Sequence, residues 1–280
     1  MKKLISIALV AIMLLQLLPM AIFAKTMDAG AVATTAPTID GFVNPEEYSW
    51  TSGKFDRNVD IENEVHVVTK YDPTKVYPWT ETSVLWSQFW MSYDADYIYL
   101  AYTERGGKSS VVWFDLNPCV GLTNSTSQLS LFLNGTTNDV SEDTGADALA
   151  GFKVYAYSAA GANAVESAAD YIVEAKKSWD DDGEMAIPTY EIKISREALA
   201  DYAARFNPGT TSFDTLGFRA FIQSNHTKQS EEVFFAQNGG EYPAWGSHGT
   251  RGYHIFDVSV ETETEPPVSE SETETEPPVS

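Results

Sequence analysis

The chain has 280 residues, 40 of them acidic and 18 basic, which gives a formal net charge of −22 at pH 7. A field of that sign repels phosphate backbones and anionic lipids, so it argues against nucleic acid and membrane surfaces as partners and suits neutral ligands and cations such as calcium. The single cysteine, Cys119, excludes an internal disulfide, and we expect it to be a small buried residue and not a reactive thiol.

The N-terminus has the pattern of a secretory signal peptide over residues 1–24. Lys2 and Lys3 are basic, the following residues to Phe23 are almost wholly apolar, and Pro19 and the small Ala24 favour cleavage near Ala24. An uncleaved anchor helix is the alternative, because the apolar run is just long enough to span a bilayer. We therefore expect a secreted, extracellular protein, free or held at the cell surface, whose mature chain does not insert into a membrane and begins with a leader over residues 25–36.

Residues 37–258 read as one domain made mostly of strands. A first helical turn is predicted at Asn44–Glu47, where asparagine caps proline and two acids, and a second helix begins at Ser195 and ends before Pro208. Between and after them, runs of aromatic and β-branched residues predict strands at 88–93, 97–104, 110–114, 128–133, 152–158, 169–175, 189–194, 216–223, 232–236 and 253–260. Many short strands without strand–helix alternation predict an all-β fold, an antiparallel β-sandwich with one or two short helices.

Two polar segments interrupt the strands. The acidic run Trp179–Gly183 is predicted as a hairpin turn, although its carboxylates could also hold calcium. The segment Tyr242–Gly249 is too rich in turn residues for a buried strand, so Trp245 is a candidate for an exposed aromatic residue.

The last segment, residues 259–280, is predicted to be a disordered Thr/Glu/Pro linker. The nine residues Glu261–Ser269 recur unchanged as Glu272–Ser280. Repeated proline and glutamate cannot build a core, and an extended chain of this length reaches up to roughly 70 Å. The domain is therefore expected to be one module of a larger protein, with further domains beyond the linker.

Several short motifs resemble family 9 of the carbohydrate-binding modules, which belongs to the wider DOMON-like group. The motifs that carry the resemblance are Ile39-Asp40-Gly41, Tyr93–Leu100, Tyr171–Ala175, Leu216-Gly217-Phe218 and Tyr242-Pro243-Ala244-Trp245. The resemblance implies a β-sandwich that needs no cofactor but is compatible with a structural calcium ion. It also implies a site in which two tryptophans enclose a sugar and polar side chains bind its hydroxyl groups.

The resemblance also names candidate carbohydrate-binding residues. Trp245 falls at the second tryptophan, with Tyr242 beside it, whereas Cys119 stands near the position of the first. Trp113 or Trp179 would have to supply the missing ring, although the strand spacing of Trp86, Trp90 and Trp113 predicts that these three tryptophans pack in the core. Polar contacts would come from Arg219, Gln223 and Asn225, and Lys153 stands where the family uses an arginine.

The expected function is therefore non-catalytic binding of a polysaccharide or oligosaccharide, with the domain serving alone or as an accessory module of a larger glycoside hydrolase. Motifs for nucleophilic, phosphate-binding or zinc-dependent catalysis are missing, which leaves only paired carboxylates open. Two alternatives remain: a structural or adhesion module with a protein partner, and a haem-binding domain that would use Met91 with His226 or His248.

Overall fold

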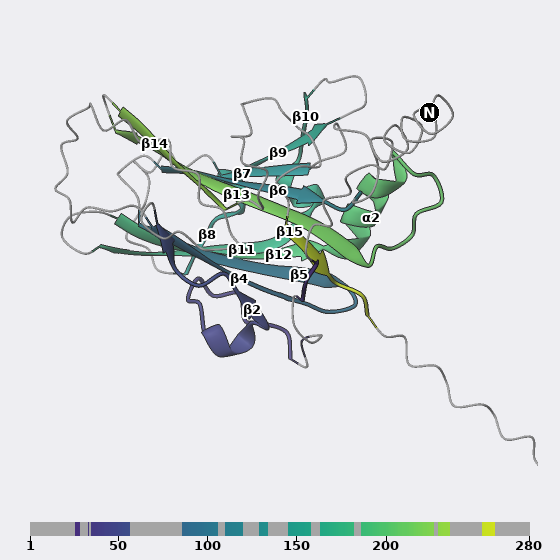
Figure 1. Cartoon of the computed structure of the whole chain (residues 1–280), viewed down its shortest axis with the longest axis horizontal. Helices are drawn as coiled ribbons and strands as arrows, with labels where there is room; N and C mark the ends of the chain where they lie inside the picture. Colours follow the sequence, from purple (N-terminus) through teal and green to yellow (C-terminus); the bar gives the residue numbers. More distant parts are fainter. Residues whose placement is uncertain are drawn as a thin grey trace, which may run out of the picture.

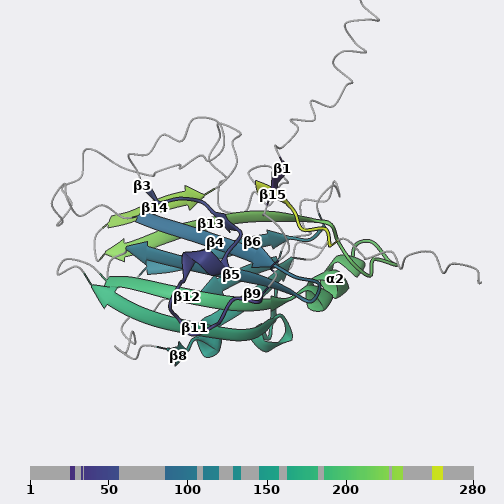
Figure 2. The same cartoon turned by 90° about the horizontal axis from the view of Figure 1, so that it is seen from below.

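Two β-sheets pack face to face in the computed structural model of the chain (Figure 1). The structure describes residues 26–28, 33, 35–56, 86–105, 110–119, 129–133, 145–157, 163–181, 186–226, 229–235 and 254–260. The fold is an all-β sandwich, as the sequence predicts. Within the described residues, α2 (Arg196–Ala204) is the only α-helix, and it lies at one end of the two sheets (Figure 2).

The upper layer in Figure 1, sheet A, has β13 and β6 at its centre. Its strands follow the order β1 (Thr26–Asp28), β15 (His254–Asp257), β13 (Thr215–His226), β6 (Ser110–Asn117), β7 (Leu129–Leu133), β9 (Phe152–Tyr157) and β10 (Asn163–Glu166), with β14 (Gln229–Phe235) also paired to β13. All the pairings are antiparallel except that of β1 with β15.

The lower layer, sheet B, is antiparallel throughout its described strands. Its order is β2 (Trp50–Thr51), β4 (Trp86–Tyr93), β5 (Tyr97–Arg105), β12 (Ala186–Ser195), β11 (Ile172–Asp181) and β8 (Ala146–Asp147), and β3 (Phe55–Asp56) pairs with β4. Three short 3₁₀ turns complete the described elements, η1 (Pro45–Glu47), η3 (Leu149–Gly151) and η4 (Ala168–Asp170).

The turn between the strands predicted at 88–93 and 97–104 and both predicted helix starts are confirmed, and local side-chain hydrogen bonds explain them. Asp94 Oδ1 accepts from the backbone N–H groups of Asp96 (2.8 Å) and Tyr97 (2.7 Å), which fixes the turn between β4 and β5. Asn44 caps η1 through the N–H of Glu46, and Ser195 caps α2 through the N–H of Ala198.

Aromatic rings fill the space between the two sheets. Phe89 of sheet B meets Phe218 of sheet A at 5.6 Å between ring centroids, and Trp50 meets Phe256 at 4.9 Å. Tyr102 stacks on Tyr190 within sheet B at 4.9 Å. All of these rings belong to or pack against one continuous buried cluster, so the sandwich derives its stability from burial, in agreement with the absence of a second cysteine.

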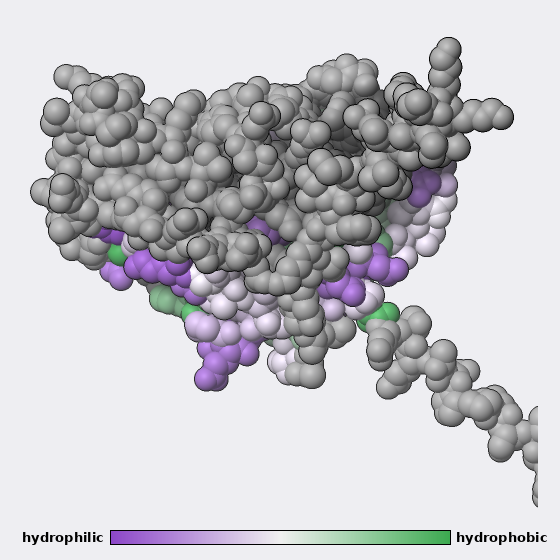
Figure 3. Space-filling view, in the orientation of Figure 1, coloured by the Kyte–Doolittle hydropathy of each residue, from purple (hydrophilic) through white to green (hydrophobic). Residues whose placement is uncertain are grey.

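A strap of residues 35–51 runs across the side of sheet B that faces away from sheet A (Figure 1). It covers a second apolar cluster whose buried members are Tyr48, Trp90, Tyr99 and Ala101. The strap explains why Trp90, which was predicted to be in the core, is buried outside the intersheet space. The described surface on this side is mainly hydrophilic, with scattered apolar residues (Figure 3). Phe42 of the strap is an exposed apolar residue.

Glu191, a fully buried residue of β12, ties the strap to sheet B. Its Oε2 accepts from the backbone N–H groups of Asp40 (3.0 Å) and Gly41 (2.8 Å), and its Oε1 accepts from the Tyr48 hydroxyl (2.8 Å). Gly41 has φ 92°, and a Cβ there would lie 2.8 Å from the carbonyl carbon and oxygen of Lys177. The Ile39-Asp40-Gly41 motif is thus explained by a close backbone approach that only glycine allows.

Among the differences from the predicted boundaries, two arise from long-range pairing. Thr26–Asp28, expected in the leader, forms β1 beside β15 at the edge of sheet A. Trp179–Asp181, expected in a turn, extends β11, since these three residues pair with Pro188, Ile187 and Ala186 of β12. The predicted signal peptide and nearly all of the linker lie outside the described residues.

An ion pair between Glu166 and Arg205 joins the end of β10 to the end of α2. Arg205 donates to both carboxylate oxygens of Glu166 and, at 3.1 Å, to the hydroxyl of the buried Tyr171, which itself donates to Glu166. Partial burial raises the pKa of Glu166, but the hydrogen bonds from Arg205 and Tyr171 outweigh it and hold the pKa below its ordinary value.

The Glu166–Arg205 pair should make stability depend on pH in the acid range. Because the folded-state pKa of Glu166 is lowered, its contribution is present above the unfolded-state pKa and is lost as the pH falls through the folded value. We expect Arg205→Gln to lower the free energy of unfolding by about 0.5–1 kcal/mol at neutral pH and by less near pH 3. The expected loss is small because Arg205 is exposed and solvent screens the ion pair. Urea unfolding against pH measures this, with Lys176→Gln as a control; equal losses at both pH values would contradict it.

Candidate functional site

The outer face of sheet A, turned away from sheet B, carries the candidate polar residues. The inner positions are established by burial: Leu216 and Phe218 on β13, Leu116 on β6, and Val154 on β9 are all buried in the core. Successive residues of a strand alternate between faces. The intervening positions therefore belong to the outer face, and on β9 these are the exposed Lys153 and the half-buried Tyr155.

Cross-strand pairing assembles an aromatic row on this outer face. Phe221 of β13 pairs with Phe234 of β14 and with Trp113 of β6, Trp113 pairs with Phe132 of β7, and Phe132 pairs with Lys153 of β9. Neighbouring strands are about 4.8 Å apart, so the four aromatic positions span roughly 14 Å across the sheet. Nothing in the local sequence joins these residues; only the sheet topology does.

Polar positions flank the aromatic row on both sides. On one side, Arg219 pairs with Asp115, Asp115 with Ser130, and Ser130 with Tyr155. On the other side, Gln223 pairs with Glu232, and Asn225 with Ser230. Arg219 and Gln223 are the neighbours of Phe221 on the same face of β13, so three of the predicted residues, Arg219, Gln223 and Asn225, share one face with the aromatic row.

Trp179 occupies a different part of the fold. It lies on β11 of sheet B, opposite the buried Pro188, on the same face as the core residue Tyr190 two positions further along β12. Its indole nitrogen is buried, with no hydrogen-bond partner for it among the described residues. The structure therefore does not bring Trp179 together with Arg219, Gln223 and Asn225. Tyr242 and Trp245 lie outside the described residues and stay predictions.

Cys119 is buried at the end of β6, as predicted. Its backbone N–H donates to Asn117 Oδ1 at 2.9 Å, and burial raises the pKa of the thiol to about 12. A thiol that stays protonated at neutral pH is not a nucleophile. Cys119 is therefore a packing residue, and a side chain at this depth could not offer a sugar an exposed surface.

Two further expectations concern bound groups. The residues described in the structure contain no group of three or more His, Cys, Asp and Glu side chains placed to hold a metal ion, and Asp182–Glu184 fall outside those residues, so calcium stays a prediction. For haem, Met91 is buried in the intersheet cluster next to the contact of Trp50 with Phe256. His248 lies outside the described residues, so the haem alternative stays a prediction.

The matches with solved structures have low sequence identity. A family 9 carbohydrate-binding module from Caldicellulosiruptor kristjanssonii in complex with cellotriose matches with 11% identity and a TM-score of 0.41, covering 85% of this chain and 98% of its own. The same module in complex with glucose matches with 12% identity and a TM-score of 0.40, covering 84% and 98%. A candidate carbohydrate-binding protein from Bacteroides uniformis matches with 13% identity and a TM-score of 0.42, covering 69% and 86%.

The sequence matches no family model and no curated protein. The family that the sequence motifs resemble is thus found among structures similar to this chain. Separately, none of the helices in the described part of the chain is long and apolar enough to cross a bilayer.

Proposed function

We propose that this protein is a secreted, non-catalytic carbohydrate-binding module that binds a polysaccharide or oligosaccharide on the outer face of sheet A. The observation that carries the proposal is the strand register, which sets Arg219 and Gln223 on either side of Phe221 and directly beside the strand that holds Trp113. This arrangement joins an aromatic row to polar flanks on one surface.

The chemistry of that surface suits a sugar. Aromatic rings present rigid apolar faces against which the C–H faces of a pyranose can stack at low entropic cost. The flanking positions hold hydrogen-bond donors in Arg219 and Gln223 and acceptors in Asp115 and Glu232, and hydroxyl groups require both. The strong negative charge of the chain favours a neutral glycan over an anionic one.

Trp113 replaces Cys119 as the proposed first ring of the site. The resemblance left Trp113 and Trp179 as the two substitutes. Trp113 lies one strand away from Arg219 and Gln223 in the same sheet, whereas Trp179 belongs to the other sheet. Trp245 and Tyr242 would add a second aromatic surface from the loop that joins β14 to β15.

The rest of the chain fits a module that works outside the cell. The N-terminal pattern of a signal peptide, the single buried cysteine and the repeated linker all suit a secreted domain held at a distance from whatever follows. In this role the domain would bring an attached catalytic or anchoring segment to a polysaccharide.

Affinity electrophoresis of the purified chain on a panel of neutral and acidic polysaccharides tests the proposal. We expect a neutral glycan to retard the protein and Trp245→Ala to weaken the retardation about 5- to 150-fold, the range for losing one stacked ring. If Trp245→Ala is retarded as strongly as the native protein, the segment Tyr242–Gly249 is not part of the binding site. If no glycan retards the native protein, the outer face does not bind carbohydrate and a module with a protein partner is the better account.

A further inference from the structure

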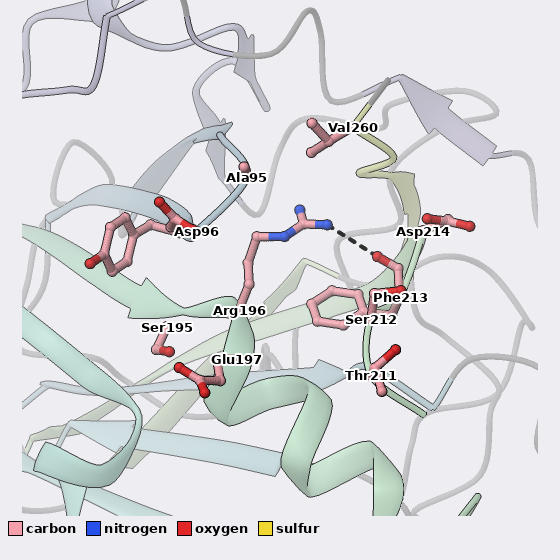
Figure 4. Close-up of a pocket in the computed structure, with 11 residues that line it drawn as sticks. Ala95, Asp96, Ser195, Arg196, Glu197, Thr211, Ser212, Phe213, Asp214 and Val260 are labelled. Atoms are coloured by element: carbon pink, nitrogen blue, oxygen red, sulfur yellow. Dashed lines mark hydrogen bonds between the residues drawn. The ribbon is translucent and has the colours of Figure 1, made fainter. Parts of the chain in front are cut away.

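A cavity lies at the end of the sandwich, beside the first turn of α2. Its volume is about 640 Å³, within the range of small-molecule sites. Three segments that are distant in the sequence line it: Ala95–Tyr97 at the turn between β4 and β5, Ser195–Glu197 at the start of α2, and Thr211–Asp214 before β13. Val260 completes the lining (Figure 4). None of these residues belongs to the outer face of sheet A.

The buried part of the cavity is formed by Arg196 and Phe213, each 8% exposed. The guanidinium of Arg196 extends from α2 toward the space between Ala95 and Val260 (Figure 4). Its Nη2 donates to the Phe213 carbonyl at 3.1 Å, and it lies 5.0 Å from the centre of the Phe213 ring. These contacts hold the side chain in place, but Nη1 is buried and has no hydrogen-bond acceptor among the residues that the structure describes.

A buried donor without a partner is unusual in a folded protein and calls for an acceptor. Around Arg196 the cavity offers three exposed carboxylates, Asp96, Glu197 and Asp214, and the hydroxyl groups of Thr211 and Ser212. The carboxylates need donors, whereas Arg196 needs an acceptor. Three carboxylates against one guanidinium also make the cavity electronegative, which disfavours an anion, and a metal ion could not accept a hydrogen bond from Nη1.

We propose that this cavity is a second ligand site, which takes a neutral polyhydroxylated molecule such as a single sugar residue. Each hydroxyl group both donates and accepts, so one ligand satisfies the carboxylates and Arg196 Nη1 together. Phe213 and Val260 supply the apolar surface for the C–H groups of the ligand. The cavity shares no residue with the outer face of sheet A, so this proposal does not depend on carbohydrate binding by that face.

Titration calorimetry with glucose and glucuronate tests the site, because the two probes differ only at C6, where glucuronate carries a carboxylate in place of the hydroxymethyl group. We expect the purified chain to bind glucose with a dissociation constant on the order of 1–10 mM, as suits a ligand of this size. Glucuronate should bind about fivefold more weakly or worse, since its charge meets those of Asp96 and Asp214. If glucose does not bind in this range, or if glucuronate binds as tightly as glucose, the proposal is overturned.

Matched variants assign the binding to the cavity. Arg196→Lys should weaken glucose binding at least about tenfold, because the shorter ammonium group loses the planar Nη1 donor. The double variant Asp96→Asn with Asp214→Asn should abolish the preference for glucose over glucuronate. Asp201→Asn removes a charge from the same helix outside the cavity and should change neither. Thermal unfolding checks that Arg196→Lys is folded; if it is not, the double variant alone decides.

The Trp113→Ala background separates this site from the outer face. Glucose binding that survives Trp113→Ala and falls with the cavity variants supports the second site. Glucose binding that is lost with Trp113→Ala and kept by the cavity variants overturns it, and leaves the proposed function of the outer face intact. Conversely, if no polysaccharide retards the protein, the proposed binding site on the outer face is wrong, but the proposal for the cavity is unaffected.

Discussion

Glu191→Ala is expected to lower the free energy of unfolding by about 3–5 kcal/mol. The substitution leaves the backbone N–H groups of Asp40 and Gly41 and the hydroxyl of Tyr48 without their acceptor. All three donors belong to the strap, and the hydrogen bonds from Gly41 and Tyr48 are buried, so water cannot easily replace the carboxylate there. Loss of the strap would in turn expose the cluster of Tyr48, Trp90, Tyr99 and Ala101.

Chemical denaturation monitored by tryptophan fluorescence measures the effect of Glu191→Ala. Glu174→Ala, an exposed residue of the neighbouring strand β11, is the matched control and should change stability by less than about 0.5 kcal/mol. Glu191→Gln should cost much less than alanine, because its amide oxygen still accepts from the backbone. A loss below about 1 kcal/mol for Glu191→Ala would show that the strap does not depend on this carboxylate.

The pH dependence of Glu191 has the opposite sign to that of Glu166. Burial raises the pKa of Glu191 above its ordinary value, although the hydrogen bonds from Tyr48 and the backbone act against the rise. A raised folded-state pKa means that stability is fully present below the unfolded-state pKa and declines as the pH rises through the folded value. The stability of the native protein relative to Glu191→Gln should therefore fall as the pH rises from about 4 toward neutrality.

Trp113→Ala should weaken binding to the retarding polysaccharide about 5- to 150-fold. The expectation follows from its position, paired with Phe221 on one side and Phe132 on the other, in the centre of the aromatic row. In the proposed site, loss of this ring would remove the stacking surface beside Phe221, the position between Arg219 and Gln223. The charge of the protein is unchanged, so altered migration reports binding alone.

Affinity electrophoresis over a range of glycan concentrations measures the change for Trp113→Ala, and thermal unfolding verifies that the variant is folded. Trp86→Ala is the matched control. Trp86 is the first residue of β4 in sheet B, half-buried beneath the ammonium group of Lys54 at 4.0 Å, and it lies far from the aromatic row in the strand order. If both variants bind like the native protein while Trp245→Ala does not, the loop between β14 and β15 carries the site without the sheet.

The sequence alone predicted the elements whose signals are local. Asp94 indicates the turn between β4 and β5 because its side chain accepts hydrogen bonds from the backbone N–H groups of that turn. Asn44 and Ser195 indicate helix starts because their side chains cap the first N–H groups of η1 and α2. Alternation of apolar residues likewise indicated the strands and the all-β class. The predicted burial of Cys119 followed from residue chemistry, since a lone cysteine in a secreted chain is most often a small apolar residue.

Only the tertiary structure decided what depends on pairing between distant segments. A strand's pattern says which residues share its face, but not which strand lies beside it, because backbone hydrogen bonds are the same for every partner. Hence the sequence could not place β1 beside β15, extend β11 through Trp179, or bury Trp90 beneath a strap. For the same reason the sequence favoured Trp179 over Trp113 as a site residue, whereas the register of sheet A sets Trp113, and not Trp179, beside the strand of Arg219 and Gln223.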